Sequence, residues 1–359
     1  MRDAHLTINP AALLHNVAQV KHHAPHAKVM AMVKADAYGH GALLVSQILQ
    51  HKVDALGVAF LAEGLALRQA GITCPIAVLQ GVFNATELEL AFEHDFYLVV
   101  HQQAQIELLA QYTGTKQTLI WLKVDSGMHR LGFMPNDVLL AYQTLNQLHC
   151  VQEIILTSHF ACADDLASPQ TPQQLAVLDT LATQLPPLGR SFANSAAILA
   201  WPQSHHQWVR AGIMLYGSSP FANKNAAELN LQPVMTLQTQ IIALRTITMG
   251  ENVGYGGTWQ ATRPTRLGVI AIGYGDGYPR HILANTPVLV NGQTTVIVGR
   301  VSMDMITIDL TDIEAQLGDS VTLWGDGLPA DTIAPYANSI SYELFCQVTP
   351  RVRRLTLLN

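Results

Sequence analysis

Through the first two thirds of the chain, short apolar runs alternate with segments whose apolar positions recur at helical spacing. Eight of the runs are typical of buried strands: Val29–Val33, Ala55–Phe60, Ile76–Gln80, Tyr97–Val100, Thr118–Val124, Glu153–His159, Ser191–Ala193 and Gln207–Arg210. Helical spacing fills the intervals, for example in Ala42–Gln50, Leu61–Ala70, Ala85–His94, Gln103–Gln111, Asn136–Leu148 and Pro172–Gln184. Eight β-α alternations favour a closed parallel (β/α)8 barrel of the TIM type over an open doubly wound sheet.

From about residue 233 the pattern changes, because long helices nearly vanish and β-branched runs separated by glycine replace them. The expected strands are Val234–Thr248, Leu267–Gly273, Pro287–Val290, Thr294–Val298, Met305–Leu310, Ser320–Trp324 and Leu344–Val348. Val290-Asn291-Gly292-Gln293 predicts a hairpin, since Asn-Gly suits a type I′ turn. The fold class is therefore α/β plus β, with a barrel over residues 10–232 and a mainly antiparallel β domain over residues 233–359.

Composition narrows the class of protein. Apolar residues make up 49% of the 359 residues and charged residues 13%, so a large core is available. The net charge of −6, without a basic cluster, argues against nucleic acid or an anionic membrane surface as a partner. The four cysteines show no CxxC spacing and are expected to be reduced and mostly buried. With no secretory pattern at the start and no apolar run of about eighteen residues, we expect a soluble cytoplasmic protein.

Polar side chains gather where the predicted barrel strands end, which is where barrels place their chemistry. Lys34 ends the first strand, Lys123 and Asp125 end the fifth, His159 ends the sixth and Arg210 ends the eighth. Lysine is costly to bury because its ammonium must lose water, and burial lowers the lysine pKa. An amine with a lowered pKa attacks an aldehyde to form a Schiff base, so Lys34 is a candidate for that chemistry.

A phosphate site is predicted at the loops after the seventh and eighth strands, the usual position for one in such barrels. Asn194-Ser195 and Gly212-Ile213 stand there, and Tyr38 adds a hydroxyl. Taken singly, each side chain has an ordinary explanation, such as a strand-end lysine that reaches solvent or a hydrogen-bonded packing histidine. Taken together, a phosphate cradle, an imine-forming lysine and an arginine in one pocket are typical of a pyridoxal phosphate site.

Long sequence blocks along the whole chain identify a family. The first block, around the candidate lysine, is Val33-Lys34-Ala35-Asp36-Ala37-Tyr38-Gly39-His40-Gly41. The others are Lys123-Val124-Asp125-Ser126-Gly127-Met128-His129-Arg130-Leu131-Gly132, Ser191-Phe192-Ala193-Asn194-Ser195, Arg210-Ala211-Gly212-Ile213-Met214-Leu215-Tyr216-Gly217, Gly254-Tyr255-Gly256-Gly257-Thr258-Trp259, Gly273-Tyr274-Gly275-Asp276-Gly277, Gly299-Arg300-Val301-Ser302-Met303-Asp304 and Ser341-Tyr342-Glu343-Leu344. In their order and spacing, these blocks resemble the signatures of the bacterial alanine racemases.

The resemblance implies a pyridoxal phosphate-dependent racemase that interconverts L- and D-alanine and supplies D-alanine for peptidoglycan. Two opposed bases exchange the proton on Cα: Lys34, which carries the cofactor as a Schiff base, serves the D face, and Tyr255 serves the L face. A free tyrosine has a pKa near 10, so a base at neutral pH needs positive or hydrogen-bonding neighbours. By resemblance, His159 and Arg210 form that chain of neighbours.

Arg210 also resembles the family's partner of the pyridine nitrogen. A guanidinium, with a pKa above about 12, donates a hydrogen bond without leaving the ring fully protonated, so we expect transamination and decarboxylation to be suppressed. Arg130 is placed like the family residue that meets the cofactor's phenolic oxygen and the substrate carboxylate. Lys123 matches a lysine that is commonly carbamylated in the family. The alternative is an unmodified lysine paired with Asp125.

The same resemblance implies the remaining contacts. Cofactor binding is expected from Tyr38, Asn194, Ser195, Gly212, Ile213 and Tyr342, the substrate-side rim from Met303 and Asp304, and the entrance from Tyr274. For Lys34 and Tyr255 to reach one Cα, the resemblance implies a head-to-tail homodimer with two shared sites. Residues 1–9 are expected to join the β domain as an added strand. Asp36, Ser126, Ala211 and Ser302 depart from the commonest pattern, and none of these changes removes a catalytic group.

Other functions fit the sequence less well or remain open. A fold-related decarboxylase is disfavoured by Arg210 and Tyr255, and the small pyridoxal phosphate carrier proteins lack a β domain. A racemase of broader specificity that also acts on serine stays open. The adjacent histidines His22-His23 and His205-His206 have no i, i+4 partner and no cysteine nearby, so we expect surface residues and no metal site.

Overall fold

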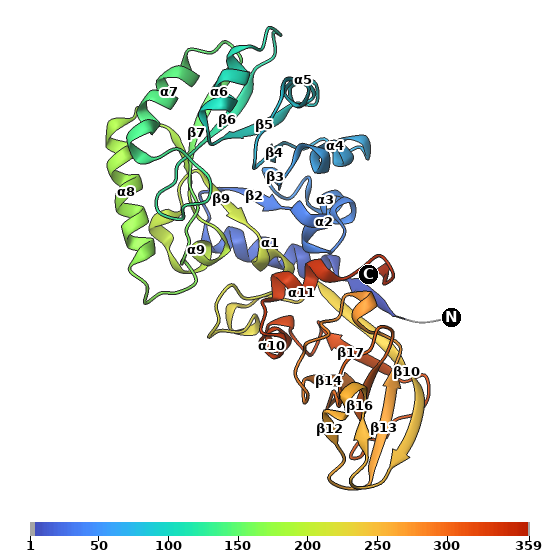
Figure 1. Cartoon of the computed structure of the whole chain (residues 1–359). Coiled ribbons are helices and arrows are strands. Elements are labelled where there is room, and N and C mark those ends of the chain that lie inside the picture. Colours follow the sequence, from blue (N-terminus) through green and yellow to red (C-terminus); the bar gives the residue numbers. More distant parts are fainter. Residues whose placement is uncertain (1–3, 358–359) are drawn as a thin grey trace. The chain divides into compact units, whose positions relative to one another are not determined.

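The computed structural model describes residues 4–357 and divides into two compact units (Figure 1). The barrel unit comprises residues 17–215 and 220–222. The β unit comprises the described residues up to 16, together with 216–219 and the described residues from 223 onward. Of the expected added strand over residues 1–9, residues 1–3 lie outside the described range, as do residues 358–359 at the other end.

Eight parallel strands form the sheet of the barrel unit. They are β2 (Lys28–Met32), β3 (Ala55–Val58), β4 (Ile76–Val78), β5 (Phe96–Val100), β6 (Thr118–Lys123), β7 (Val151–Thr157), β8 (Gly189–Ser191) and β9 (Trp208–Ala211). Their order is β8-β7-β6-β5-β4-β3-β2-β9. A backbone hydrogen bond from Arg210 N to Ala193 O (2.9 Å) links the two ends of this order, so the barrel is nearly closed. The predicted parallel barrel is confirmed.

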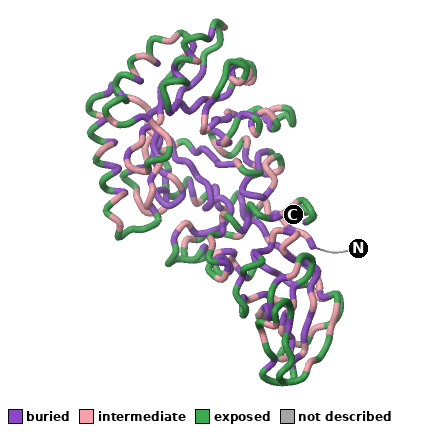
Figure 2. The backbone as a smooth tube through the Cα atoms, in the orientation of Figure 1, coloured by how far each residue is buried: buried purple, intermediate pink, exposed green. Residues whose placement is uncertain are grey.

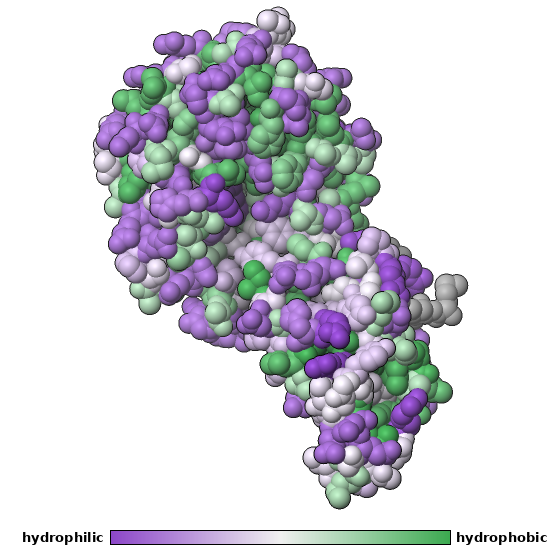
Figure 3. Space-filling model, viewed as in Figure 1, coloured by the Kyte–Doolittle hydropathy of each residue, from purple (hydrophilic) through white to green (hydrophobic). Residues whose placement is uncertain are grey.

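The barrel strands are buried on both faces, which explains their continuous apolar sequences. Every residue of β3, β4 and β9 is buried, and Figure 2 shows the barrel strands as mostly buried segments. Parallel strands covered by helices read as unbroken apolar runs, because neither face meets water. The helices of this unit lie outside the strands in Figure 1, and Figure 3 shows that its surface mixes hydrophilic and hydrophobic residues.

Where helical spacing predicts helices, the chain forms α3 (Ala42–Leu49), α4 (Leu61–Gln69), α5 (Ala85–Glu93), α6 (Gln103–Ala110), α7 (Val138–Asn146) and α8 (Gln170–Gln184). The chain also forms α1 (Pro10–His23), α2 (Lys34–Tyr38) and α9 (Ser195–Ala200). Helix α1 begins with proline at its first position, and the side chain of Asn9 accepts a hydrogen bond from Ala12 N (3.1 Å). Such an Asn-Pro start satisfies one orphan N–H group and fixes φ for the first turn.

Strands dominate the β unit. They are β1 (His5–Ile8), β10 (Met235–Ile247), β11 (Asn252–Val253), β12 (Trp259–Gln260), β13 (Thr265–Ile270), β14 (Pro287–Val290), β15 (Gln293–Val296), β16 (Ile306–Asp309), β17 (Ser320–Trp324) and β18 (Arg353–Thr356). Strand β1 pairs antiparallel with β10 and parallel with β18. The hairpin between β14 and β15 is confirmed, with Asn291 at φ 49° and Gly292 at φ 81°, as a type I′ turn requires.

The structure overturns the strand that we expected over Leu344–Val348. All of this segment except Val348 belongs to helix α11 (Ser341–Gln347), which follows α10 (Ala330–Ile333). Ser341, Leu344 and Phe345 are buried, and their i, i+3, i+4 spacing is that of one helix face. Only Val348 is β-branched, so a short apolar run here was mistaken for a strand.

Two smaller expectations are wrong in part. Cys74 and Cys150 are buried, but Cys162 is half-buried and Cys346 is exposed. His205 and His206 are half-buried, because the His206 ring packs edge-on against Phe192 at 5.0 Å between centroids. Within residues 4–357 no helix is long and apolar enough to cross a membrane.

Candidate active site

The lysine that ends strand β2 opens a left-handed turn. Ala35, Asp36, Ala37 and Tyr38 all have φ between 52° and 54°, so α2 is one turn of helix with the opposite hand. This conformation costs roughly 1–2 kcal/mol for each non-glycine residue. The turn places Lys34, which is half-buried, beside a buried Ala37 and a buried Tyr38.

Two carboxylates hold this turn in place. Glu63 of α4 accepts hydrogen bonds from Ala35 N (2.7 Å), Ala59 N (2.7 Å) and Phe60 N (3.1 Å). Asp36 accepts one from Ala42 N (2.7 Å), at the start of α3. Backbone N–H groups that face a carboxylate form strong, charge-assisted hydrogen bonds. Sequence reasoning missed Glu63, because Phe60 before the helix lacks the hydroxyl that marks a capping box, although Glu63 does accept from the Phe60 N–H as such a box requires.

Arg210 is buried at the end of β9 and engages the ends of two neighbouring strands. Its Nη1 donates to Ser191 O (2.6 Å), Ser191 Oγ (2.8 Å) and Thr157 Oγ1 (3.2 Å). Its Nη2 donates to Ser158 O (2.5 Å), Phe192 O (3.2 Å) and His159 Nδ1 (3.4 Å). Among the described residues, its Nε–H has no hydrogen-bond partner.

Burial lowers the pKa of Arg210 to about 10, so the guanidinium stays charged at neutral pH. This value is below the one that we expected from the sequence, and the reason is desolvation. His159 responds to the same burial and to the cations Arg210, Arg130, Lys123 and Lys34, which together hold its pKa well below 6.5. His159 is therefore a neutral imidazole at neutral pH, and it accepts from Arg210 at Nδ1.

Lys123 lies in this group of cations. Burial and the nearby charges of Arg210, Arg130 and Lys34 lower its pKa to about 8. The side chain of Asp125 turns to the backbone, where Oδ1 accepts from Gly127 N (3.0 Å), Met128 N (3.1 Å) and His129 N (3.0 Å). Among residues 4–357 no ion pair joins Lys123 to Asp125, so the simple pairing that we held open is not formed.

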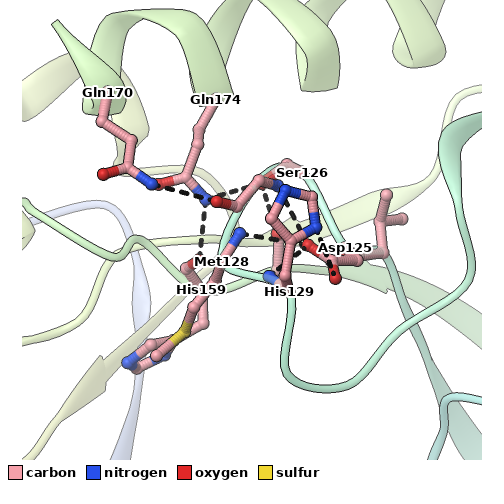
Figure 4. A network of polar contacts seen from close by, with 10 residues as sticks. Asp125, Ser126, Met128, His129, His159, Gln170 and Gln174 are labelled. Carbon is pink, nitrogen blue, oxygen red and sulfur yellow. Dashed lines mark hydrogen bonds and ion pairs between the residues drawn. The ribbon is translucent and has the colours of Figure 1, made fainter.

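One small pocket lies at the ends of β6 and β7. It is lined by Lys123, Val124, Asp125, Ser126, Met128, Arg130, Leu131 and His159. Figure 4 shows the turn after β6 folded beside His159. Lys123 and Arg130 bring two basic side chains to this lining, and such side chains attract an anionic group.

A cradle for a second anion is present at the loops after β8 and β9. Ser195 Oγ accepts from Gly212 N (2.9 Å) and Met214 N (3.4 Å). A Cβ atom at Gly212 would lie only 2.8 Å from the Tyr38 hydroxyl and 3.7 Å from Ser195 Oγ. The three groups therefore surround one small space that glycine keeps open. Asn194 has a different local task, because its side chain caps α9 by accepting from Ala197 N (3.1 Å).

The other predicted site residues lie in the β unit. Tyr255, in a short 3-10 turn (Tyr255–Gly257), is 66% exposed, and Tyr342 on α11 is half-exposed. The remaining predicted residues, Tyr274, Met303 and Asp304, lie on two loops that are hydrogen bonded to each other. Tyr274 N donates to Ser302 O (3.0 Å), and Gly275 N donates to Met303 O (2.9 Å). Arg351, which sequence reasoning missed, donates from Nη2 to Asp304 Oδ1 (2.5 Å) and pairs with the buried Asp276 (3.4 Å).

The geometry of the barrel unit defines a class of enzyme. A cradle of hydroxyl and backbone groups is suited to a phosphate, and a strand-end lysine and a charged guanidinium share its barrel mouth. This combination is typical of barrel enzymes that use a phosphorylated cofactor on amino acid substrates.

Comparison with known proteins makes the class specific. Residues 8–220 match the family model "Alanine racemase, N-terminal domain", and residues 234–356 match "Alanine racemase, C-terminal domain". The chain is 48% identical over 349 residues to the alanine racemase of Nitrosococcus oceani, with 97% of each chain covered. The alanine racemase of Pseudomonas fluorescens is 47% identical, with the same coverage.

Solved structures agree. The biosynthetic alanine racemase of Pseudomonas aeruginosa superposes with a TM-score of 0.97 at 44% identity, and both chains are covered completely. The alanine racemase of Acinetobacter baumannii gives a TM-score of 0.95 at 40% identity, with 99% of this chain and 100% of that chain covered. This chain belongs to the alanine racemase family.

Proposed function

We propose that this chain interconverts L- and D-alanine with pyridoxal 5′-phosphate as cofactor. It is an isomerase, a member of the alanine racemase family over its full length. The observation that carries the proposal within the site is Arg210, a buried cation whose Nε–H has no hydrogen-bond partner in the described part of the chain. The role implied by the family is the supply of D-alanine for peptidoglycan in the cytoplasm.

The residues present fit the cofactor. The Tyr38 hydroxyl and Ser195 Oγ both approach the backbone at Gly212, where a side chain would crowd them, and hydroxyls and backbone N–H groups grouped in this way suit a phosphate. Ile213 N, Asn194 and Tyr342 would complete the phosphate contacts. The Nε–H of Arg210 would donate to the pyridine nitrogen, and Lys34 would supply the amine that attaches the cofactor. The cluster of Lys34, Lys123, Arg130 and Arg210 provides the positive charge that an anionic cofactor and substrate need.

When bound, pyridoxal phosphate withdraws the negative charge that develops at Cα as the proton leaves. Arg210 limits that withdrawal, because a guanidinium with a pKa of about 10 donates a hydrogen bond but keeps its own proton at neutral pH. An aspartate at this position would favour a protonated ring instead. The arginine therefore favours brief charge separation and return of the proton over decarboxylation.

Two bases on opposite faces of Cα complete the proposal. The Lys34 amine removes or returns the proton on the D face, and the Tyr255 phenol does so on the L face. Tyr255 is exposed within its own unit, so its side chain is available to a second molecule. We propose a head-to-tail homodimer in which Tyr255 of one chain serves the barrel of the other, with Met303, Asp304 and Tyr274 at the substrate rim and entrance.

Arg130 is proposed to bind the substrate carboxylate, and Lys123 to brace it as a carbamate. Carbamylation joins the Lys123 amine nitrogen to the carbon of CO2 with loss of a proton, so it requires a neutral amine. A pKa of about 8 leaves a useful neutral fraction near neutral pH. The reaction would convert one member of a crowded cluster of cations into an anion, which relieves repulsion toward Arg130.

The test uses the purified full-length chain loaded with pyridoxal phosphate. In D2O we expect L-alanine to gain deuterium at Cα while D-alanine accumulates, as followed by chiral chromatography and mass spectrometry. A panel of L-amino acids that includes serine measures specificity. Production of an amine and CO2 from any member of the panel would favour a decarboxylase. Failure to take up the cofactor or to form any D-amino acid would overturn the proposal.

A further inference from the structure

Helix α8, on the outside of the barrel, carries two glutamines that reach the loops after β6 and β7 (Figure 4). Gln170 and Gln174 are one helical turn apart, so both side chains leave the same face of the helix. Gln174 is 1% exposed, while its neighbour Gln173 is exposed to solvent. A buried amide is costly unless it is hydrogen bonded, so the bonds of Gln174 need an explanation.

All of the polar hydrogens of the Gln174 amide are used, and their directions are fixed. Its Nε2 donates to His159 O (3.0 Å) and to Ser126 Oγ (3.0 Å), while its Oε1 accepts from Ala161 N (3.0 Å). A backbone carbonyl only accepts and a backbone N–H only donates, so the amide has a single satisfactory orientation. Neither glutamate nor an apolar side chain of similar length reproduces this pattern.

These bonds hold the loop ends that carry two of the predicted site residues. Ser126 Oγ lies 2.9 Å from Ser158 Oγ, and Ser158 Oγ donates to Val124 O (2.9 Å), so the two loops are also joined to each other. Ser126 begins the turn that leads to Arg130, and Ser158 precedes His159. Gln170 adds an outer tie, since its Nε2 donates to Gly127 O (3.0 Å) and its Oε1 accepts from Cys162 Sγ (2.9 Å).

The backbone at Ser158 and His159 is therefore held from two elements. Arg210, from β9, donates to Ser158 O (2.5 Å) and to His159 Nδ1 (3.4 Å). Gln174, from α8, donates to His159 O. Without the bond from Gln174, the remaining side-chain and backbone bonds act on Ser158, and the backbone carbonyl of His159 loses its support. The contact between the guanidinium and the imidazole then loses its fixed geometry. Misplacement of a functional group by about 1 Å can cost a hundredfold in rate.

We infer that Gln174, supported by Gln170, is a positioning residue that fixes His159 against Arg210 and fixes the turn that carries Arg130. The inference rests on the proposed function. Helix α8 thereby aligns His159 with Arg210 for proton transfer and aligns Arg130 for the substrate carboxylate. Gln174 itself contacts neither substrate nor cofactor.

The decisive variant is Gln174→Met, which keeps the length of the side chain and removes all three hydrogen bonds. We expect kcat/KM for L-alanine to fall on the order of tenfold to a hundredfold. The dissociation constant of pyridoxal phosphate, from absorbance titration, should change by less than about threefold, because the cradle of Tyr38, Ser195 and Gly212 uses other loops. The matched control is Gln173→Met, on the solvent side of the same turn, which should match the wild-type chain.

A readout without turnover tests the positioning itself. The 15N shifts of the His159 imidazole in the full-length holoenzyme report its protonation. Burial and the charges of Arg210, Arg130, Lys123 and Lys34 depress its pKa, so a loosened loop should move the midpoint upward, toward 6.5. The acid limb of the pH profile of kcat/KM should move in the same direction.

The outcomes are separable. A Gln174→Met chain with kcat/KM within twofold of wild type and an unchanged imidazole titration overturns the inference, even if its melting temperature falls. If that variant does not fold, Gln170→Met takes its place, with an expected threefold or smaller loss and an upward imidazole shift, and no change there also overturns it. The imidazole titration reads the positioning even in a chain that racemises nothing, so failure of the proposed function is distinguishable.

Discussion

The most buried predicted site residues of the barrel unit differ sharply in exposure from the most exposed ones of the β unit. In the barrel unit, Arg210 and Ser195 are 7% and 4% exposed, and several hydrogen bonds engage each of them. In the β unit, Tyr255 and Met303 are 66% and 52% exposed and lie on short turns or loops. The barrel thus arranges its chemistry before any ligand arrives, whereas the β unit presents side chains that remain open to another molecule.

This difference in exposure matches two different roles in the proposed reaction. Groups that must hold a fixed cofactor profit from preorganisation, because they need no rearrangement during the reaction. Groups that meet a substrate, or a second chain, must stay accessible until that partner binds. Substitutions that remove groups from one side of this contrast test it.

The largest effect is expected from Lys34→Ala, which removes the preorganised amine. Racemisation should fall to background in both directions, since both the attachment of the cofactor and one base are lost. Chiral chromatography of reactions started from L-alanine and from D-alanine measures this. Lys52→Ala, at an exposed position, is the control. Residual activity of one per cent or more in either direction would contradict the role of Lys34.

Tyr255→Phe removes the accessible base while leaving the barrel untouched. Turnover from L-alanine should fall by about 10²–10⁴-fold, the usual range for loss of a general base, and uptake of the cofactor should persist. Tyr142→Phe, on helix α7, is the matched control. Full activity from L-alanine in the Tyr255 variant would show that another group serves this face.

Glu63→Gln tests whether the left-handed turn needs a carboxylate. The amide has a single acceptor oxygen and loses charge assistance toward three backbone N–H groups, so we expect a stability loss of about 1–3 kcal/mol. Weaker binding of the cofactor should accompany it. Urea unfolding and absorbance titration measure the two effects. Glu89→Gln, on the exposed side of α5, should change neither, and equal behaviour of the two variants would refute this role.

The free energy of unfolding should depend on pH, with opposite slopes for a group in each unit. The Lys123 pKa is lowered to about 8 from 10.5, so between these values the unfolded chain binds more protons and the free energy of unfolding rises with pH. In the β unit, burial raises the pKa of Asp331 above 3.8 despite hydrogen bonds from Ser218 and Ser219, so stability falls as pH rises through that range.

Urea unfolding across pH in CO2-free buffer measures both trends. Lys123→Met should remove the rise, which amounts to at most about 3 kcal/mol, and Asp331→Asn should remove the fall. A wild-type chain that shows no rise between pH 8 and 10.5 while retaining bound carbamate would instead mean that Lys123 is modified before unfolding begins.

The sequence predicted the barrel well because its signal is repeated eight times. Each barrel strand ends within two residues of its expected bounds, as for Ser191–Ala193 against Gly189–Ser191. A local signal without repetition predicts less well: the apolar run Leu344–Val348 predicts a strand where the chain forms the helix Ser341–Gln347. Nothing in the sequence predicted four left-handed residues after Lys34, because alanine and tyrosine disfavour that conformation unless their surroundings impose it.

Candidate site residues can be proposed from the sequence where the residue type itself carries the chemistry. A strand-end lysine or arginine stands out, as Lys34 and Arg210 do. Residues that act through a neighbour do not stand out. Gln174 looks like any polar position on a helix, and only the bonds to Ser126, His159 and Ala161 reveal its burial. Long-range hydrogen bonds of this kind depend on the folded geometry, which a sequence pattern does not encode.

The reversed hand of the segment from Ala35 to Tyr38 has a consequence for heat inactivation. A segment in an unfavourable conformation returns to a relaxed one as soon as its supports weaken, and local opening of this kind precedes global unfolding. On gradual warming, the chain should therefore lose turnover several degrees before its circular dichroism changes. Cooling before the main transition should restore the activity.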